Sequence, residues 1–150
     1  AFQMQFVFAE AGYVYIFGPG ENNQPTAFLT TKPSAETGLE SNHTSGGAEF
    51  SFPSGVQLLR LEKKPGTDRF TVIFSKTRLE SPSFLSAAVT GEPLQSNQLA
   101  DFNSFVSKYS KVAPLIELDE SNNQKPSVRV KGNANQSGEP FVFEVRIQHN

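Results

Sequence analysis

The stretch 12–17, Gly-Tyr-Val-Tyr-Ile-Phe, decides the fold class of this chain because it is apolar on both faces of the strand that it predicts. Such a strand belongs inside a sheet that is covered on both sides. Gly18-Pro19-Gly20 and the three residues after them supply turn formers, and residues 26–30 predict the partner strand of a hairpin. The chain is therefore built around a buried β-hairpin.

Working outward, alternation of apolar and polar residues predicts further strands. Residues 2–8 place Phe and Met on one face and Gln3 and Gln5 on a solvent face. The other predicted strands cover residues 50–53, 56–61, 70–74, 115–118, 128–131 and 141–147. Turns rather than crossover helices join them, which favours a mainly β fold: an antiparallel two-layer β-sandwich of about eight strands. A partly closed β-barrel is the alternative.

One segment switches to helical spacing. Apolar residues recur at intervals of three and four behind Asn97, at Leu99, Phe102, Val106 and Tyr109. This pattern predicts one amphipathic helix of about three turns, whose apolar stripe we expect to cover an open end or edge of the β structure. A shorter helical segment is predicted over residues 82–88, capped by the Ser81 hydroxyl.

Composition supports one folded domain that spans residues 1–150. The chain has 14 Phe against 3 Tyr and no Trp, so its apolar area is concentrated in a few large side chains between polar turns. Most of these phenylalanines fall at alternating strand positions or on the helix stripe, which indicates a core rather than an aromatic binding surface. With no Cys, the sequence excludes disulfides, thiolate metal sites and a cysteine nucleophile.

Charge and hydropathy exclude two classes of partner. Thirteen Lys and Arg against 15 Asp and Glu give a net charge of -2, so we expect no nucleic-acid binding. No apolar run approaches the roughly 20 residues of a membrane helix, so we expect no membrane insertion. The chain begins at Ala1 without an initiator Met, from which we expect a mature form or an excised fragment. Its oligomeric state is left open.

Catalytic candidates are few. General base catalysis of the hydrolase type would need His43 or His149. His43 lies in a long polar segment, residues 31–47, which is either mobile or functional, and His149 is the penultimate residue. Glu117 and Glu144 take the polar positions of alternating strands, so we interpret them as solvent-facing. We predict no enzyme activity, no catalytic residue, no metal site and no cofactor.

Tyr13 and Tyr15 are the polar-tipped aromatics with a possible binding role. They share one face of the 12–17 strand, and two exposed tyrosines would form a platform for a sugar ring or a peptide. The alternative interpretation is that both are core residues with satisfied hydroxyls, since a strand this apolar is usually central. Tyr13, Tyr15 and His43 are therefore the candidate binding residues.

The order of these motifs resembles the bacterial domain-of-unknown-function family 4384. The similarity covers residues 2 to about 85: the Gly-Tyr-Val-Tyr strand, the segment 27–30, the strand 50–53 and the hairpin 65–75, Pro-Gly-Thr-Asp-Arg-Phe-Thr-Val-Ile-Phe-Ser. Where the family has Phe-Pro-Asn, this chain has Thr31-Lys32-Pro33, followed by an expanded polar segment. The resemblance implies an accessory, noncatalytic domain of the kind attached to kinase, caspase-like, signalling or envelope proteins, and it brings no active site.

We therefore expect a noncatalytic accessory module of a larger bacterial protein that binds protein or peptide. Strand edges and the segment 31–47 are the expected contact surfaces. The expected location is extracytoplasmic, in the periplasm or cell envelope, with the cytoplasm as the alternative. A carbohydrate-binding module that uses aromatic stacking is the second hypothesis for function, and a hydrolase is the third.

Overall fold

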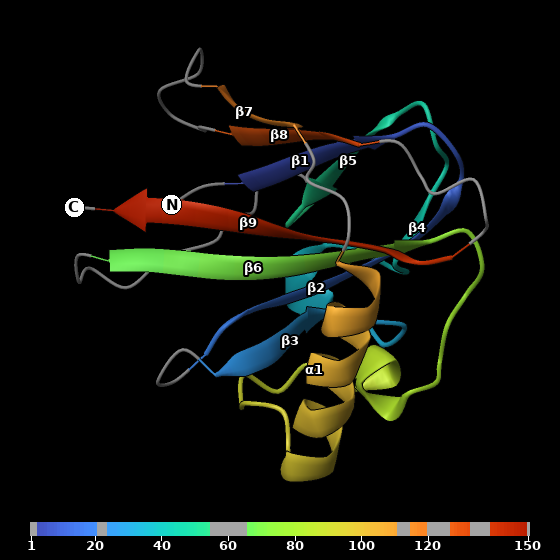
Figure 1. Cartoon of the computed structure of the whole chain (residues 1–150). Coiled ribbons are helices and arrows are strands. Elements are labelled where there is room, and N and C mark those ends of the chain that lie inside the picture. The colour runs from blue at the N-terminus through green and yellow to red at the C-terminus, as the bar shows by residue number, and fades with distance from the viewer. Residues whose placement is uncertain are drawn as a thin grey trace.

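Two β-sheets packed face to face form the body of the molecule, and one α-helix lies against the outer face of the larger sheet (Figure 1). The computed structural model describes residues 3–20, 24–54, 66–110, 115–119, 127–132 and 139–149. In chain order the elements are β1 (Gln3–Phe8), β2 (Gly12–Pro19), β3 (Pro25–Leu29), η2 (Ala35–Thr37), β4 (His43–Thr44), β5 (Glu49–Phe52), β6 (Gly66–Ser75), η3 (Ser83–Ser86), α1 (Ser96–Tyr109), β7 (Leu115–Asp119), β8 (Ser127–Gly132) and β9 (Phe141–His149).

The sheet topology confirms the predicted two-layer sandwich with one helix. The four-stranded sheet has the order β5-β1-β8-β7, and the five-stranded sheet has the order β3-β2-β6-β9, with β4 paired to β2. Among the described strands each sheet ends in edge strands, so the alternative of a partly closed barrel is not the architecture. The predicted strand at 56–61 lies outside the described residues.

One pair departs from the antiparallel prediction, because β1 and β8 run parallel, from Gln3 opposite Ser127 to Phe8 opposite Gly132. Parallel neighbours need a long crossover, and the chain between these two strands builds α1 and every strand of the five-stranded sheet except β9. Alternation in a sequence reports which face a side chain takes, and it carries no information on strand direction.

The inter-sheet core contains most of the phenylalanines. Phe6 and Phe8 from β1 meet Phe74 and Phe143 from β6 and β9, and the rings of Phe8 and Phe74 stack with centroids 4.4 Å apart. Burial of each such side chain stabilises the fold by roughly 1.5–3 kcal/mol. Gly18 permits close packing here, since a Cβ at this position would lie 2.6 Å from the Phe28 ring.

The first strand also contains a polar exception. Gln3 was expected on the solvent face, and this prediction is wrong, because its side chain is buried and its Nε2 donates a hydrogen bond to the Pro53 carbonyl oxygen. A buried amide is tolerated when its donors find such partners. The long-range contact joins β1 to the residue that follows β5.

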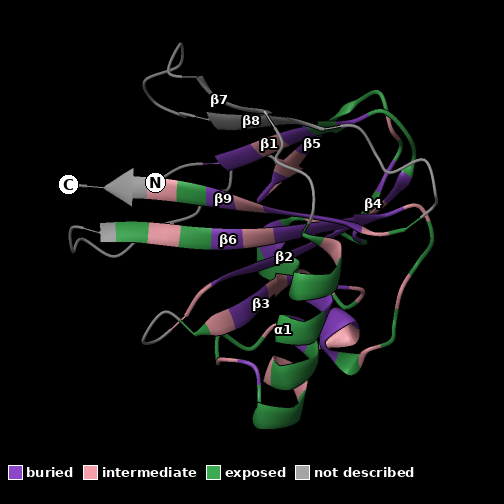
Figure 2. Cartoon of the chain, in the orientation of Figure 1, coloured by how far each residue is buried: buried purple, intermediate pink, exposed green. Residues whose placement is uncertain are grey.

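A second core lies on the outer face of the five-stranded sheet. Phe17 of β2 contacts Phe84 of η3 and Phe102 of α1, with ring centroids 5.5 and 5.2 Å away. Tyr15, Ile73 and Val142 belong to the same cluster. The predicted helix therefore covers the face of a sheet rather than an open end or edge, and Figure 2 shows its outward side exposed.

Two local predictions about helix starts are wrong. α1 begins at Ser96, so Asn97 lies inside the helix rather than before it. The shorter segment is a 3-10 helix of Ser83–Ser86 that follows Pro82 without a side-chain cap, so the Ser81 hydroxyl does not cap it. Packing of Phe84 and Leu85 into the outer-face core holds this short helix in place of a cap. Within the described ranges, no helix is long and apolar enough to cross a membrane.

Candidate functional site

The outer face of the five-stranded sheet changes character along β6 and β9. Near α1 its outward side chains are apolar and buried, as at Ile73 and Val142. Farther along the same strands the outward positions become polar, with Thr71 and Arg69 on β6 and Glu144 on β9. The helix layer therefore covers only part of this face, and the polar part is open to a partner (Figure 2).

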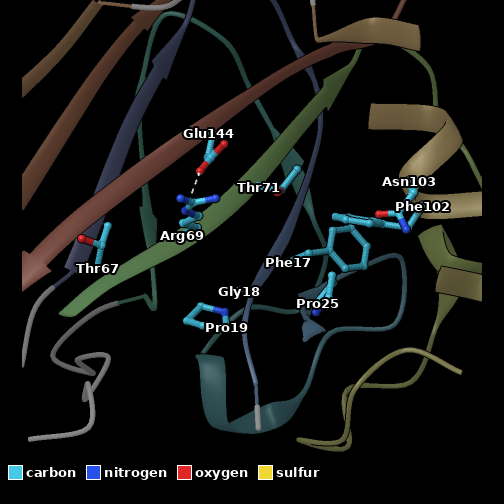
Figure 3. Close-up of a pocket in the computed structure, with 10 residues that line it drawn as sticks. All are labelled: Phe17, Gly18, Pro19, Pro25, Thr67, Arg69, Thr71, Phe102, Asn103 and Glu144. Atoms are coloured by element: carbon cyan, nitrogen blue, oxygen red, sulfur yellow. Dashed lines mark ion pairs between the residues drawn. The ribbon is translucent and has the colours of Figure 1, made fainter. Parts of the chain in front are cut away.

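A groove of about 460 Å³ follows the boundary between these two parts (Figure 3). Its lining comes from β2, β3, β6, β9 and α1: Phe17, Gly18, Pro19, Pro25, Thr67, Arg69, Thr71, Phe102, Asn103 and Glu144. Phe17 and Phe102 are themselves almost wholly buried, so the prolines, the threonines, Asn103 and the charged pair form its accessible surface. The groove is polar on the side formed by β6 and β9, where Thr67, Arg69, Thr71 and Glu144 line it.

Two arginines and one carboxylate form the charged part of this surface. Arg69 of β6 stands directly opposite Arg146 of β9 in the strand register. Glu144 Oε1 lies 3.6 Å from Arg69 Nε and 3.0 Å from Arg146 Nε. The arginine side chains are 67% and 63% exposed and that of Glu144 is 37% exposed, so the cluster faces solvent and has one net positive charge.

The two edges of the five-stranded sheet differ in whether another segment of the chain covers them. The β3 edge is covered by residues 85–94: Leu94 N donates to Pro25 O at 2.9 Å, Thr31 N donates to Leu85 O at 3.2 Å, and Thr26 forms a bridge with Pro93. At the opposite edge, β9 is paired over nine residues with β6 and, in the part of the chain that the structure describes, with no other strand. β9 is therefore a long edge with an outward row of backbone groups.

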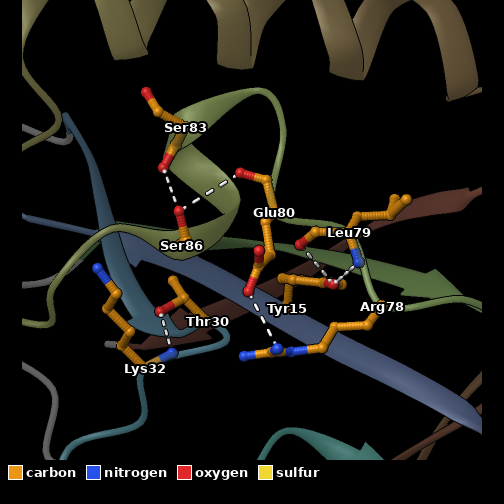
Figure 4. Close-up of polar contacts among 8 residues, drawn as sticks. All are labelled: Tyr15, Thr30, Lys32, Arg78, Leu79, Glu80, Ser83 and Ser86. Carbon is orange, nitrogen blue, oxygen red and sulfur yellow. Dashed lines mark hydrogen bonds and ion pairs between the residues drawn. The ribbon is translucent and has the colours of Figure 1, made fainter.

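Tyr15 does not contribute to a surface platform. It is fully buried, and its hydroxyl both donates to Leu79 O at 2.9 Å and accepts from Leu79 N at 2.7 Å (Figure 4). Burial raises the pKa of the Tyr15 hydroxyl, and the hydrogen bond from the Leu79 backbone opposes that rise only in part. Tyr15 is therefore a structural link between β2 and the segment before η3, and a platform that uses both tyrosines is not formed.

Tyr13 and His43 are brought together. They are paired across β2 and β4, and their rings meet edge to face with centroids 5.1 Å apart. Tyr13 is half-buried and His43 is exposed. The Ser41 hydroxyl accepts a hydrogen bond from the His43 backbone N–H at 3.2 Å, whereas the described contact of the His43 imidazole is with the Tyr13 ring. The side chain of His149 lies outside the described residues.

The polar segment 31–47 is anchored to the sandwich over its second half. Asn42 exchanges two hydrogen bonds with Val14 of β2: Val14 N donates to Asn42 O at 2.8 Å, and Asn42 Nδ2 donates to Val14 O at 3.0 Å. Gly47 N donates to Phe8 O at 2.6 Å. Asn42 and Thr44 are buried, so this part of the segment has a structural role, while Glu40, Ser41, His43, Ser45 and Gly47 are exposed.

Two other features carry less functional information. A second groove of about 420 Å³ lies beside β3, η2 and the end of β5, and among its described lining residues Glu36 is the only ionisable one. Among the described residues, no group of three or more His, Cys, Asp and Glu side chains is arranged to hold a metal ion.

Sequence reasoning missed Arg69 and Arg146 and recognised Glu144 only as solvent-facing. The alternating pattern contained part of the signal, because it placed Glu144 and Arg146 on the outer face of the last strand. Their partner Arg69 lies on another strand, and the register that opposes it to Arg146 is a property of the folded sheet.

Comparison with known proteins gives no relative from which a role could be transferred: no family model, no curated protein and no solved structure matches the chain.

Proposed function

We propose that this chain is a noncatalytic binding module that takes up an extended segment of a partner protein along the edge of β9. The observation that carries the proposal is the unequal treatment of the two edges of one sheet. Residues 85–94 cover the β3 edge with backbone hydrogen bonds, whereas nine residues of β9 are paired on the β6 side only, within the described structure.

Strand addition is the physical mechanism that such an edge supports. An added strand satisfies the outward N–H and C=O groups of the edge, and alternate side chains of the peptide then lie over the sheet face. Proteins commonly protect a long edge by covering it, as residues 85–94 do for β3. The groove beside α1 opens on the same sheet face and gives those side chains a place to bind.

We further propose that the module is an accessory part of a larger bacterial protein with an extracytoplasmic location. This context is proposed from the order of the strand and hairpin motifs in residues 2 to about 85 alone, since no family model matches the chain. The carbohydrate hypothesis loses its main support because Tyr15 is buried. The hydrolase hypothesis is not favoured, because the Ser41 hydroxyl beside His43 is hydrogen-bonded to the backbone N–H of His43 and the described contact of the imidazole is with the Tyr13 ring.

Peptide display combined with amide hydrogen exchange tests the proposal. A random-peptide library is panned on the purified chain, and the selected peptides are added to isotope-labelled protein. We expect slower exchange at alternate residues of β9, because the N–H groups of successive strand residues point to opposite sides and every second one faces away from β6. The amides of β3 serve as the internal control and should not change. Failure to select any peptide, or protection at a surface other than β9, would contradict the proposal.

A further inference from the structure

Arg69 and Arg146 form an unusual cross-strand pair. Like charges that stand directly opposite on one face of a sheet destabilise it, and these two guanidinium groups are opposed in the β6·β9 register. A single carboxylate, Glu144, compensates both from a neighbouring position (Figure 3 shows its contact with Arg69). The three side chains together therefore have one net positive charge.

Stability alone does not account for the pair. All three side chains are substantially exposed, and exposed ion pairs contribute roughly 0–1 kcal/mol. Both contacts to Glu144 use the Nε group of the arginine. Among the described residues, no second carboxylate is paired with the terminal Nη groups, which form the planar fork that binds a carboxylate with two parallel hydrogen bonds.

We infer that Arg69 and Arg146 recognise an acidic side chain of the peptide that is added at β9. The inference rests on the proposed function and names its specificity. Arg146 lies on the edge strand itself, so an outward residue of the added strand is its direct cross-strand neighbour. Arg69 lies one strand farther in and reaches the same carboxylate through its long side chain, while Thr67 and Thr71 flank it in the groove. The occupant is an extended segment that bears Asp or Glu at the position facing this pair.

Glu144 then acts as an internal competitor. In the free protein its carboxylate holds the Nε groups of both arginines, and in the complex it shares them with the carboxylate of the peptide. Removal of the Glu144 charge leaves two positive charges for one ligand carboxylate. This predicts that Glu144→Gln strengthens binding of an acidic peptide, an effect opposite to that expected if Glu144 were itself a ligand-binding residue.

The test uses a selected peptide that protects β9 amides, synthesised in its acidic form and with the acidic residue replaced by its amide. We expect the amide form to bind the wild-type chain about two- to fivefold more weakly, as for one exposed ion pair. Arg146→Gln and Arg69→Gln should each weaken the acidic peptide by a similar factor and should abolish most of the difference between the two peptides. Glu144→Gln should increase affinity for the acidic form only.

Arg78→Gln is the matched control, because Arg78 is also an exposed arginine with a carboxylate partner, Glu80, at 3.0 Å, yet lies outside β6 and β9 (Figure 4). This variant should bind both peptides as the wild type does. Thermal unfolding of every variant establishes that it is folded at the temperature of the binding measurement.

The outcomes separate the two proposals. If peptides protect β9 but the acidic and amide forms bind equally well, or if the difference persists unchanged in Arg146→Gln, the inference about the arginine pair is overturned and strand addition stands. If no peptide protects β9, strand addition is overturned, and the role of the arginine pair falls with it.

Discussion

The inner and outer faces of the five-stranded sheet are made by the same strands and yet serve different purposes. Inward positions of β2, β6 and β9 are apolar along nearly the whole described length and pack against the other sheet. Outward positions are apolar only where η3 and α1 cover them and become threonine, arginine and glutamate beyond the helix. We therefore expect a partner protein to bind where η3 and α1 no longer cover the outer face, because a partner at that place displaces water and not another part of the chain.

The largest expected effect comes from truncation on the inner face. Phe74→Ala removes a fully buried ring that stacks on Phe8, and we expect it to lower the free energy of unfolding by about 3–5 kcal/mol. Urea unfolding followed by circular dichroism measures the change. Thr71→Ala, on the outer face of the same strand, is the control and should alter stability by no more than about 0.5 kcal/mol. Similar losses for the two variants would contradict the contrast between the faces.

Substitution of Gly18 on the inner face should give the next largest loss of stability. A Cβ at Gly18 would lie 2.8 Å from the Phe70 ring as well as near Phe28, so Gly18→Ala should cost about 1–3 kcal/mol through overpacking. Chemical denaturation is again the measurement. The control is Gly91→Asn, because nothing lies within 4 Å of a Cβ there and asparagine tolerates the positive φ of 82°. A neutral Gly18→Ala would show that the inner core is loosely packed.

Loss of the Tyr15 hydroxyl should destabilise the part of the outer face that η3 and α1 cover. Tyr15→Phe leaves the part-buried N–H and C=O of Leu79 without their partner, and we expect a loss of about 1–3 kcal/mol at neutral pH. Tyr109→Phe on the same outer-face cluster is the control, since that ring lies at its partly exposed rim. Equal effects of the two substitutions would show that the Leu79 contact does not stabilise this layer.

Alkaline pH should lower the stability of the fold through ionisation of Tyr15. Because burial raises the pKa of Tyr15 in the folded state, its hydroxyl ionises first in the unfolded chain, where the pKa is about 10. The stabilisation that neutral Tyr15 provides is complete below that pH and is lost as pH rises toward the folded-state pKa. Stability of the wild type should therefore fall more between pH 9 and about 11 than stability of Tyr15→Phe does. Parallel pH profiles in urea unfolding would contradict this.

The smallest effect on stability is expected at the uncovered part of the outer face. Glu144→Gln removes two exposed ion pairs and should change the free energy of unfolding by no more than about 0.5 kcal/mol, even though it changes peptide binding. Differential scanning calorimetry at low and at physiological ionic strength measures it. A loss comparable to that of Tyr15→Phe would mean that the charged cluster stabilises the fold. The covered and uncovered parts of the outer face would then contribute equally to stability, which would contradict the comparison.

Strand positions were predictable where the alternation was strong, as in β1, β2, β6 and β9. The assignment of Gln3 to solvent failed because a hydrogen bond to Pro53, fifty residues away, makes burial of an amide acceptable. The cap assigned to Ser81 failed because packing of Phe84 and Leu85 sets the position of η3. Of the candidate binding residues, sequence placed Tyr13 and Tyr15 correctly on one face, but it could not say that a backbone segment near Leu79 covers the second of them.

The sequence by itself determined the class of the fold, because the period of its apolar residues decides which side chains leave water, and that driving force acts on each segment locally. Tertiary structure alone decided the parallel pairing of β1 with β8, the cover on the β3 edge and the opposition of Arg69 to Arg146. Each of these depends on register and direction between segments far apart in the chain. Those relations are set by packing of the whole sandwich, which no local pattern encodes.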